Sequence, residues 1–174
     1  GVIDPEEMNG MDDDGNGYID DNIGYDMADR DPYPDPNTSQ YSHGTTVAGV
    51  AAAKTNNGVG VASLGNGITV LPIKAANAPN TITHGYEAIL YAASMGADVI
   101  CMAWGSPTSS ITEQNIINYA YSKGCVMVAG VGNDNQNAMY YPAAYNHVIS
   151  VAATQSNDAK AAFSNYGTWV DVSV

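Results

Sequence analysis

The chain has 174 residues, of which 45% are hydrophobic and 13% are charged, which is enough apolar material for one domain with a sizeable core. Its formal net charge is −13 and its five lysines and arginines are scattered singly, so it lacks the basic surface that nucleic-acid binding requires. No run approaches the roughly 18 consecutive apolar residues of a membrane-spanning helix, and the first residues do not resemble a signal peptide. If the protein is exported, we expect its signal to lie upstream.

The acidity is concentrated in residues 1–36, which hold 12 of the 18 acidic residues and one base, and so carry −11 of the net charge. Within this region the sequence DDDGNGYID places oxygen-bearing residues at alternating positions around a glycine, as in a calcium-binding loop. Hard oxygen donors without histidine or cysteine favour calcium over zinc. The predicted ligands are Asp12, Asp14, Asn16, Tyr18 through its carbonyl, Asp20 and, completing the set, Asp21.

The twelfth position of this loop is Ile23 and not the bidentate glutamate of an EF-hand, so we do not expect a true EF-hand. The alternative interpretation is a solvated acidic turn that binds no metal.

From residue 43 onward, helical and extended patterns alternate. A helix over 84–97 should end at Gly96, and a helix over 110–124 should begin with a capping box formed by Ser110 and Glu113. The remaining segments are an Ala-rich helix at 43–53, a β-branched run at 67–77, and strands at 98–104, 125–131 and 147–154.

Short apolar strands separated by helices indicate an α/β fold, a doubly wound and mostly parallel sheet with helices on both faces. No repeat or linker divides the chain, so residues 1–174 are expected to belong to one domain. Ligands of such sheets lie at the carboxyl ends of the strands, here the loops 103–112 and 130–142. The two cysteines, Cys101 and Cys125, lie in apolar runs and predict free, buried thiols.

Three short motifs are candidates for chemistry. His43 opens a helix and is followed by glycine, which leaves its imidazole accessible as a general base, although a structural histidine is the more common case. Asn133 follows the small residues Ala129, Gly130 and Gly132 at a strand end, where a side-chain amide can donate to an oxyanion. The segment 104–106 can offer a strand edge to an extended peptide.

Together and in this order, SHGTTVAG, VICMAWGS, VMVAGVGND and the run from YPAAYNHVISV to FSNYG resemble the subtilisin-like serine proteases (subtilases), in the central part of their catalytic domain. The resemblance implies that His43 is the triad histidine and Asn133 the oxyanion-hole residue. It also implies a substrate cleft with one wall formed by Ala103, Trp104 and Gly105, and a facing wall formed by Ala129, Gly130 and Val131.

A second acidic cluster lies shortly before His43 and resembles a calcium loop of some subtilases. Its members are Asp26, Asp29, Asp31 and Asp35. From the family we further expect a polypeptide substrate and a secreted or cell-surface location. No membrane span is expected.

The nucleophile motif Gly-Thr-Ser is not found in the 174 residues, and Asp4 is a weak match to the triad aspartate. A lone imidazole forms no acyl-enzyme, so this chain by itself is expected to be inactive. The alternatives are a pseudoprotease or peptide-binding module, and a purely structural calcium-binding domain. Apolar faces of an incomplete domain also predict self-association.

Overall fold

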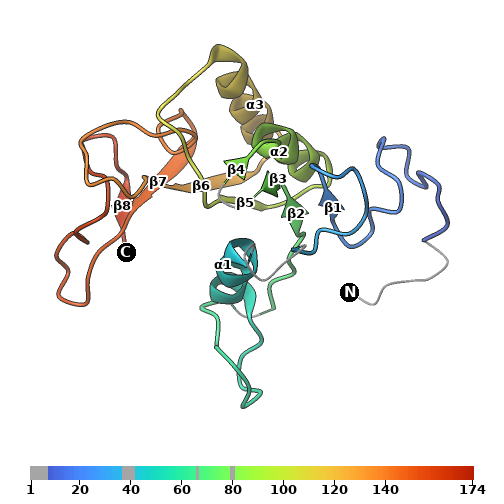
Figure 1. Cartoon of the computed structure of the whole chain (residues 1–174), viewed down its shortest axis with the longest axis horizontal. Helices are drawn as coiled ribbons and strands as arrows, with labels where there is room; N and C mark the ends of the chain where they lie inside the picture. The colour runs from blue at the N-terminus through green and yellow to red at the C-terminus, as the bar shows by residue number, and fades with distance from the viewer. Residues whose placement is uncertain (1–7, 37–41, 66, 79–80) are drawn as a thin grey trace. The chain divides into compact units, whose positions relative to one another are not determined.

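A computed structural model describes residues 8–36, 42–65, 67–78 and 81–174 (Figure 1). Asp4, the weak candidate for a triad aspartate, lies outside these ranges. The chain divides into two units, residues 1–88 and 89–174, and each is considered by itself. No helix in the described ranges is both long and apolar enough to cross a membrane.

The first unit contains short elements. Strand β1 (Tyr25–Asp26) pairs in parallel with β2 (Ile73–Lys74), and β3 (Ala76–Ala78) pairs antiparallel with β4 (Thr81–Ile82). Helix α1 (His43–Ala52) has no fully buried residue, and α2 (Gly85–Ser94) starts in this unit and continues into the next.

The second unit is built on a four-stranded parallel sheet. Its strands are β5 (Val99–Met102), β6 (Val126–Gly130), β7 (Val148–Ala152) and β8 (Val172–Ser173), in the order β5-β6-β7-β8. The connection from β5 to β6 runs through α3 (Ile111–Ser122), whose N-cap Ser110 accepts a hydrogen bond from the Glu113 backbone N–H at 3.1 Å. The parallel sheet, with a helix in the connection from β5 to β6, confirms the predicted α/β class.

The register of the sheet sorts its side chains into a buried and an exposed face. Ile100 pairs with Met127, which pairs with Val148, and all three are buried. On the other face Val99, Val126 and Ile149 are 59%, 48% and 39% exposed. Because α3 contributes the fully buried Ile117 and Ala120, the core of this unit lies between α3 and one face of the sheet, with α3 beside the strands in Figure 1.

The helices end where the sequence predicts. Gly96 and Gly124 follow α2 and α3 with φ of +75° and +93°, the left-handed region in which glycine carries no Cβ penalty. The predicted strand over 67–77 is reduced to β2 and β3, and Pro72 just before β2 has no N–H to give to a ladder. One cysteine prediction is wrong: Cys125 is buried, but Cys101 is on the exposed face of β5.

Candidate active site and acidic loops

His43 is the first residue of α1 and its side chain is exposed. Two hydrogen bonds stabilise the first turn of this helix: the Thr46 backbone N–H and hydroxyl both donate to the Ser42 carbonyl, at 2.9 and 3.0 Å. The imidazole is therefore presented at a helix N-terminus, the local geometry that the sequence predicts. His43 belongs to the first unit, whereas Asn133 belongs to the second.

Asn133 lies three residues beyond the end of β6 and is exposed. In the described part of the chain we find no hydrogen bond that occupies its side-chain amide, which leaves that amide available to donate to a ligand. The backbone turns sharply just before it, where Gly132 has φ of +99°. A Cβ at Gly132 would lie 2.5 Å from Asn165 Nδ2, so both the conformation and the packing require glycine there.

The two predicted walls of the cleft leave the sheet side by side. Met102 at the end of β5 pairs with Ala129 of β6, so the segments 103–105 and 130–132 start from neighbouring strand ends. Ala129 and Val131 are 2% and 1% exposed, and their side chains belong to the core. Of the second wall, only Gly130 and the backbone are therefore available to a substrate.

The predicted peptide-pairing edge is shorter than the sequence suggests. The Ser106 N–H donates to the Tyr141 carbonyl at 2.9 Å, and the Tyr141 N–H donates back to the Ser106 carbonyl at 2.8 Å. This bridge uses both backbone groups of Ser106. The other residues of the predicted wall, Ala103, Trp104 and Gly105, follow β5 and are not part of it.

Tyr140 is a site residue that sequence reasoning missed. A Cβ on Gly132 would lie 3.1 Å from its Cδ1, and a Cβ on Gly105 would lie 3.8 Å from the same atom, so the ring lies against Gly105 of the first wall and against Gly132, which follows the second wall. A hydrogen bond to the Asp134 carboxylate is the main cause that raises the pKa of the Tyr140 phenol above its usual value. Nothing in the local pattern around residue 140 distinguishes this tyrosine from its neighbour Tyr141.

The first acidic loop is organised around its own backbone. Asp12 accepts hydrogen bonds from the Asn16 and Gly17 N–H groups, at 3.0 and 2.9 Å, and Asp14 accepts from the Asn16 N–H at 3.1 Å. The Asn16 amide donates to Asp14 at 3.1 Å and to Asp21 at 2.9 Å. Four of the predicted ligands thus surround one turn.

Two other predicted ligands lie at the margin of that turn. Asp20 closes the base of the loop, since its carboxylate accepts from the Asn9 and Gly10 N–H groups at 2.8 and 3.0 Å. Tyr18 packs edge-on against Tyr25, with ring centroids 4.8 Å apart. Within the described ranges, no three His, Cys, Asp or Glu side chains form a group that could hold a metal ion. The hard-oxygen donor set of Asp12, Asp14, Asn16 and Asp21 fits calcium in chemistry, with Asn16 joining the carboxylates.

One lysine pairs with two of the four aspartates of the second acidic cluster. Lys74 Nζ donates to the Asp26 carboxylate and, at 2.8 Å, to the Asp29 carboxylate, and Asp26 is 1% exposed. Asp31 faces its own turn, where it accepts the Tyr33 N–H at 2.9 Å. A calcium ion at Asp26 and Asp29 would compete with an ammonium group that is already in place, and calcium at this cluster stays a prediction.

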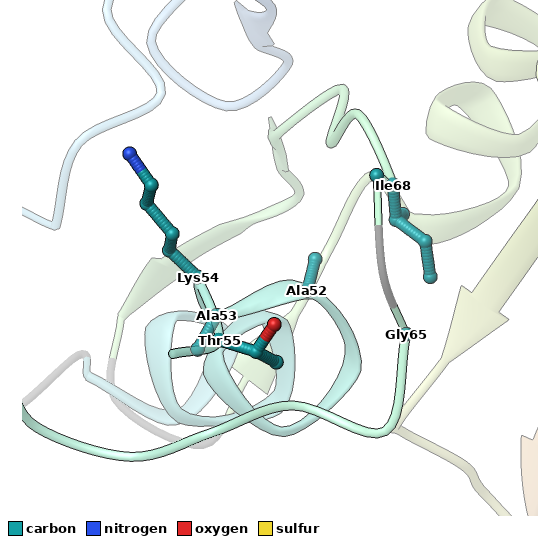
Figure 2. Close-up of a pocket in the computed structure, with 7 residues that line it drawn as sticks. Ala52, Ala53, Lys54, Thr55, Gly65 and Ile68 are labelled. Atoms are coloured by element: carbon teal, nitrogen blue, oxygen red, sulfur yellow. The ribbon is translucent and has the colours of Figure 1, made fainter. Parts of the chain in front are cut away.

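A pocket in the first unit lies away from the predicted chemistry. It has a volume of about 310 Å³ and is lined by Ala52, Ala53, Lys54, Thr55, Gly65, Gly67 and Ile68. These residues follow or end α1, whereas His43 begins it. Figure 2 shows the Lys54 side chain pointing away from Ile68. None of the predicted catalytic or substrate-binding residues lines this pocket, so it is not treated as a candidate active site.

Comparisons with known proteins agree with the geometry. The family model of the subtilase family (peptidase S8) matches residues 5–174. The chain is 44% identical over 151 residues to a thermophilic serine proteinase of Bacillus sp. (strain AK1), covering 86% of this chain and 37% of that protein. It is 40% identical over 151 residues to an extracellular protease of Xanthomonas campestris pv. campestris, covering 79% of this chain and 26% of that protein.

Among solved structures, a protease from Pseudoalteromonas arctica PAMC 21717 is similar with a TM-score of 0.69 and 38% identity, over 73% of this chain and 41% of that one. The chain thus spans well under half the length of these relatives. The family match over nearly the whole chain leads to one conclusion: this chain belongs to the subtilase family.

Proposed function

We propose that the protein carrying this chain is a subtilisin-like serine endopeptidase. The observation that supports this proposal most is the exposed Asn133 amide, which lies three residues after β6, the strand that neighbours β5. An accessible amide at the carboxyl end of a parallel strand is suited to stabilise an oxyanion.

In this mechanism His43 acts as the general base. It takes the proton of a serine hydroxyl, the serine oxygen attacks the scissile carbonyl, and Asn133 Nδ2 donates to the oxyanion of the tetrahedral intermediate. His43 then returns the proton to the leaving amine, and water hydrolyses the acyl-enzyme. The Gly-Thr-Ser motif is not among residues 1–174, so we expect this chain alone to be inactive.

We propose that the substrate is an extended polypeptide that pairs with the backbone of residues 103–105. Gly130 is exposed and has no side chain, and no atom lies within 4 Å of where its Cβ would be, so space for an apolar substrate side chain is present there. When an extended peptide pairs with a strand edge, the backbone hydrogen bonds provide affinity, and the pockets that accept its side chains provide selectivity.

We also propose calcium as a stabilising cofactor of the first acidic loop. The ion would be held by Asp12, Asp14, Asn16 and Asp21. Asp20 would stabilise the base of the loop through the hydrogen bonds that its carboxylate accepts from the Asn9 and Gly10 N–H groups. A bound calcium ion would neutralise the negative charge of the three neighbouring carboxylates.

The alternative function is a pseudoprotease or peptide-binding module that retains the cleft but not the chemistry. Peptide binding without turnover would favour it. A secreted or cell-surface location is proposed on the similarity to an extracellular protease. Self-association is proposed because the exposed face of the sheet presents Val99, Val126 and Ile149.

The experiment that tests the proposal is peptide cleavage by the whole protein in calcium buffer, with and without a serine-directed inhibitor. We expect turnover that the inhibitor abolishes. Residues 1–174 alone, as the matched control, should show none. Cleavage by residues 1–174 at the rate of the whole protein, or turnover insensitive to the inhibitor, would contradict the assignment.

A further inference from the structure

Asn165 is a buried polar residue with no part in the mechanism described above. It is 0% exposed and lies in the connection between β7 and β8. A buried side-chain amide is normally hydrogen-bonded through both its oxygen and its nitrogen. Its hydrogen-bond partners therefore identify the segment that it holds in place.

The hydrogen-bond partners of its side chain all lie in the loop formed by residues 131–136, which carries Asn133. Asn165 Oδ1 accepts the Asp134 and Gln136 N–H groups, both at 3.0 Å, and Nδ2 donates to the Val131 carbonyl at 3.0 Å. The oxygen receives two donors and the nitrogen one acceptor, which fixes the orientation of the amide. The side chain therefore holds the loop on both sides of Asn133 and leaves Asn133 itself exposed.

Backbone hydrogen bonds extend the same contact. The Asn165 N–H donates to the Gly132 carbonyl at 3.0 Å, and the Asn135 N–H donates to the Phe163 carbonyl at 2.8 Å. Gly132 leaves no space for more than a hydrogen on its Cα, because its missing Cβ would overlap Asn165 Nδ2 at 2.5 Å. The two segments are thus in direct contact from residue 131 to residue 136.

We infer that Asn165 is a positioning residue for the oxyanion hole: its buried amide fixes the 131–136 loop and thereby the direction of the Asn133 amide. This rests on the proposed function of Asn133. An oxyanion donor acts only when it is already aimed at the developing charge, so a loop free to move loses catalysis without losing substrate affinity.

The first test needs no catalysis and uses hydrogen exchange on the whole protein. In the wild type the Asp134 and Gln136 amides should exchange slowly, and in Asn165→Ala they should exchange at least about tenfold faster. Ser164→Ala is the matched control. Ser164 is also buried, and its hydroxyl binds the Ala153 N–H and the Asn165 carbonyl but not the 131–136 loop. It should leave both amides protected.

Asn165→Asp covers the case in which the alanine variant fails to fold. It is nearly the same size and keeps the oxygen that accepts from Asp134 and Gln136, but it has no donor for the Val131 carbonyl. Those two amides should stay protected in this variant. Equal exchange rates at the two amides in wild type and Asn165→Ala, or their loss of protection in Asn165→Asp, would overturn the assignment.

The second test is kinetic and uses a double-mutant cycle. We expect Asn165→Ala to lower kcat by about 10- to 100-fold with KM changed by less than about twofold. In an Asn133→Ala background the same substitution should change kcat by less than about twofold, since its effect passes through Asn133. Losses that multiply, or a similar loss in Ser164→Ala, would mean that Asn165 serves only stability. If the whole protein cleaves no peptide, the proposed function fails, and the exchange measurement still decides whether Asn165 holds the loop.

Discussion

At the scale of single residues, the candidate site contains a glycine, Gly132, at which any larger side chain would cause backbone strain and a steric clash. Gly132 combines φ of +99° with contacts at 2.5 Å to Asn165 Nδ2 and 3.1 Å to Tyr140 Cδ1 for any added Cβ. Gly130, two residues earlier, has open space around its Cα and no positive φ. The same substitution should therefore have very different costs at the two glycines.

We predict that Gly132→Ala lowers the free energy of unfolding by about 1–3 kcal/mol, from backbone strain and the enforced shift of Asn165. Gly130→Ala, its control, should change the free energy of unfolding by less than about 0.5 kcal/mol. Urea denaturation of the whole protein followed by tyrosine and tryptophan fluorescence measures both. Equal destabilisation by the two substitutions would contradict the packing argument.

Asp171 is the residue whose protonation should matter in acid. Its carboxylate accepts the Ser150 N–H at 2.8 Å and the Ser150 hydroxyl at 2.9 Å, and these hydrogen bonds lower its pKa below the usual value. A pKa lowered in the folded state contributes stability that is fully present above the unfolded value, about 3.9. That contribution is lost as the pH falls through the folded-state pKa.

We therefore predict that Asp171→Asn destabilises the protein at pH 7 and that the difference from wild type shrinks below about pH 4. Urea midpoints measured across pH 2.5–7 test this, with Asp158→Asn as the control, because it removes the same charge from an exposed side chain. A difference between wild type and Asp171→Asn that stays constant down to pH 2.5 would argue that the carboxylate does not hold Ser150.

At the scale of elements, the start of α3 is held by more than its own sequence. Ser110 caps the helix through its side chain, as predicted, but its own N–H donates to the Tyr145 hydroxyl at 2.8 Å. The Tyr145 hydroxyl in turn donates to the Glu113 carboxylate. The tyrosine thus occupies the place that the glutamate takes in an ordinary capping box.

Tyr145→Phe should lower the free energy of unfolding by about 1–3 kcal/mol, because it leaves the Ser110 N–H and the Glu113 carboxylate without their partner. Tyr141→Phe is the matched control. The Tyr141 hydroxyl makes only a weak contact with the Met139 sulfur, at 3.6 Å. Thermal denaturation of the two variants gives the comparison, and an equal loss in both would show that the hydroxyl network does not stabilise α3.

The elements also show what the local sequence could and could not predict. Hydrophobic periodicity and the glycines that end α2 and α3 were sufficient to predict both helices, because these signals act over a few residues. The hydrogen bond between Ser110 and Tyr145 joins residues 35 positions apart in the sequence, and that between Asn165 and Val131 joins residues 34 positions apart. Such contacts are formed by the fold, and no local pattern carries them.

The candidate site divides in the same way. Asn133 and His43 are predictions that rest on the order of the motifs along the chain. Lys74 was not predicted as the partner of Asp26, since 48 residues separate them and only the pairing of β1 with β2 brings them together.

At the scale of the whole molecule, charge is the dominant feature. The net charge is −13, and most of it lies in residues 1–36, where like charges repel unless a cation neutralises them. In the first acidic loop the described neighbours of Asp12 and Asp14 are backbone N–H groups and the Asn16 amide, not cationic side chains. Calcium should therefore stabilise the protein by mass action.

We predict that EDTA lowers the melting temperature of the whole protein and that millimolar calcium restores it. The double substitution Asp12→Asn and Asp14→Asn should remove this response, whereas Asp158→Asn, which also removes a negative charge, should preserve it. Calorimetric titration with calcium alone tests the same site directly. No heat and no shift of the melting temperature at millimolar calcium would contradict calcium binding.

His43 as general base and Asn133 as oxyanion donor are the two roles on which the proposed peptidase activity rests, and both are tested by kcat for one peptide substrate across matched variants of the whole protein. His43→Ala should abolish measurable turnover. Asn133→Ala should lower kcat by about 10² to 10³, a magnitude taken over from the loss of one such donor in a subtilisin. His147→Asn, an exposed histidine at φ of +71°, should leave kcat unchanged. Turnover that persists in both His43→Ala and Asn133→Ala would contradict the account.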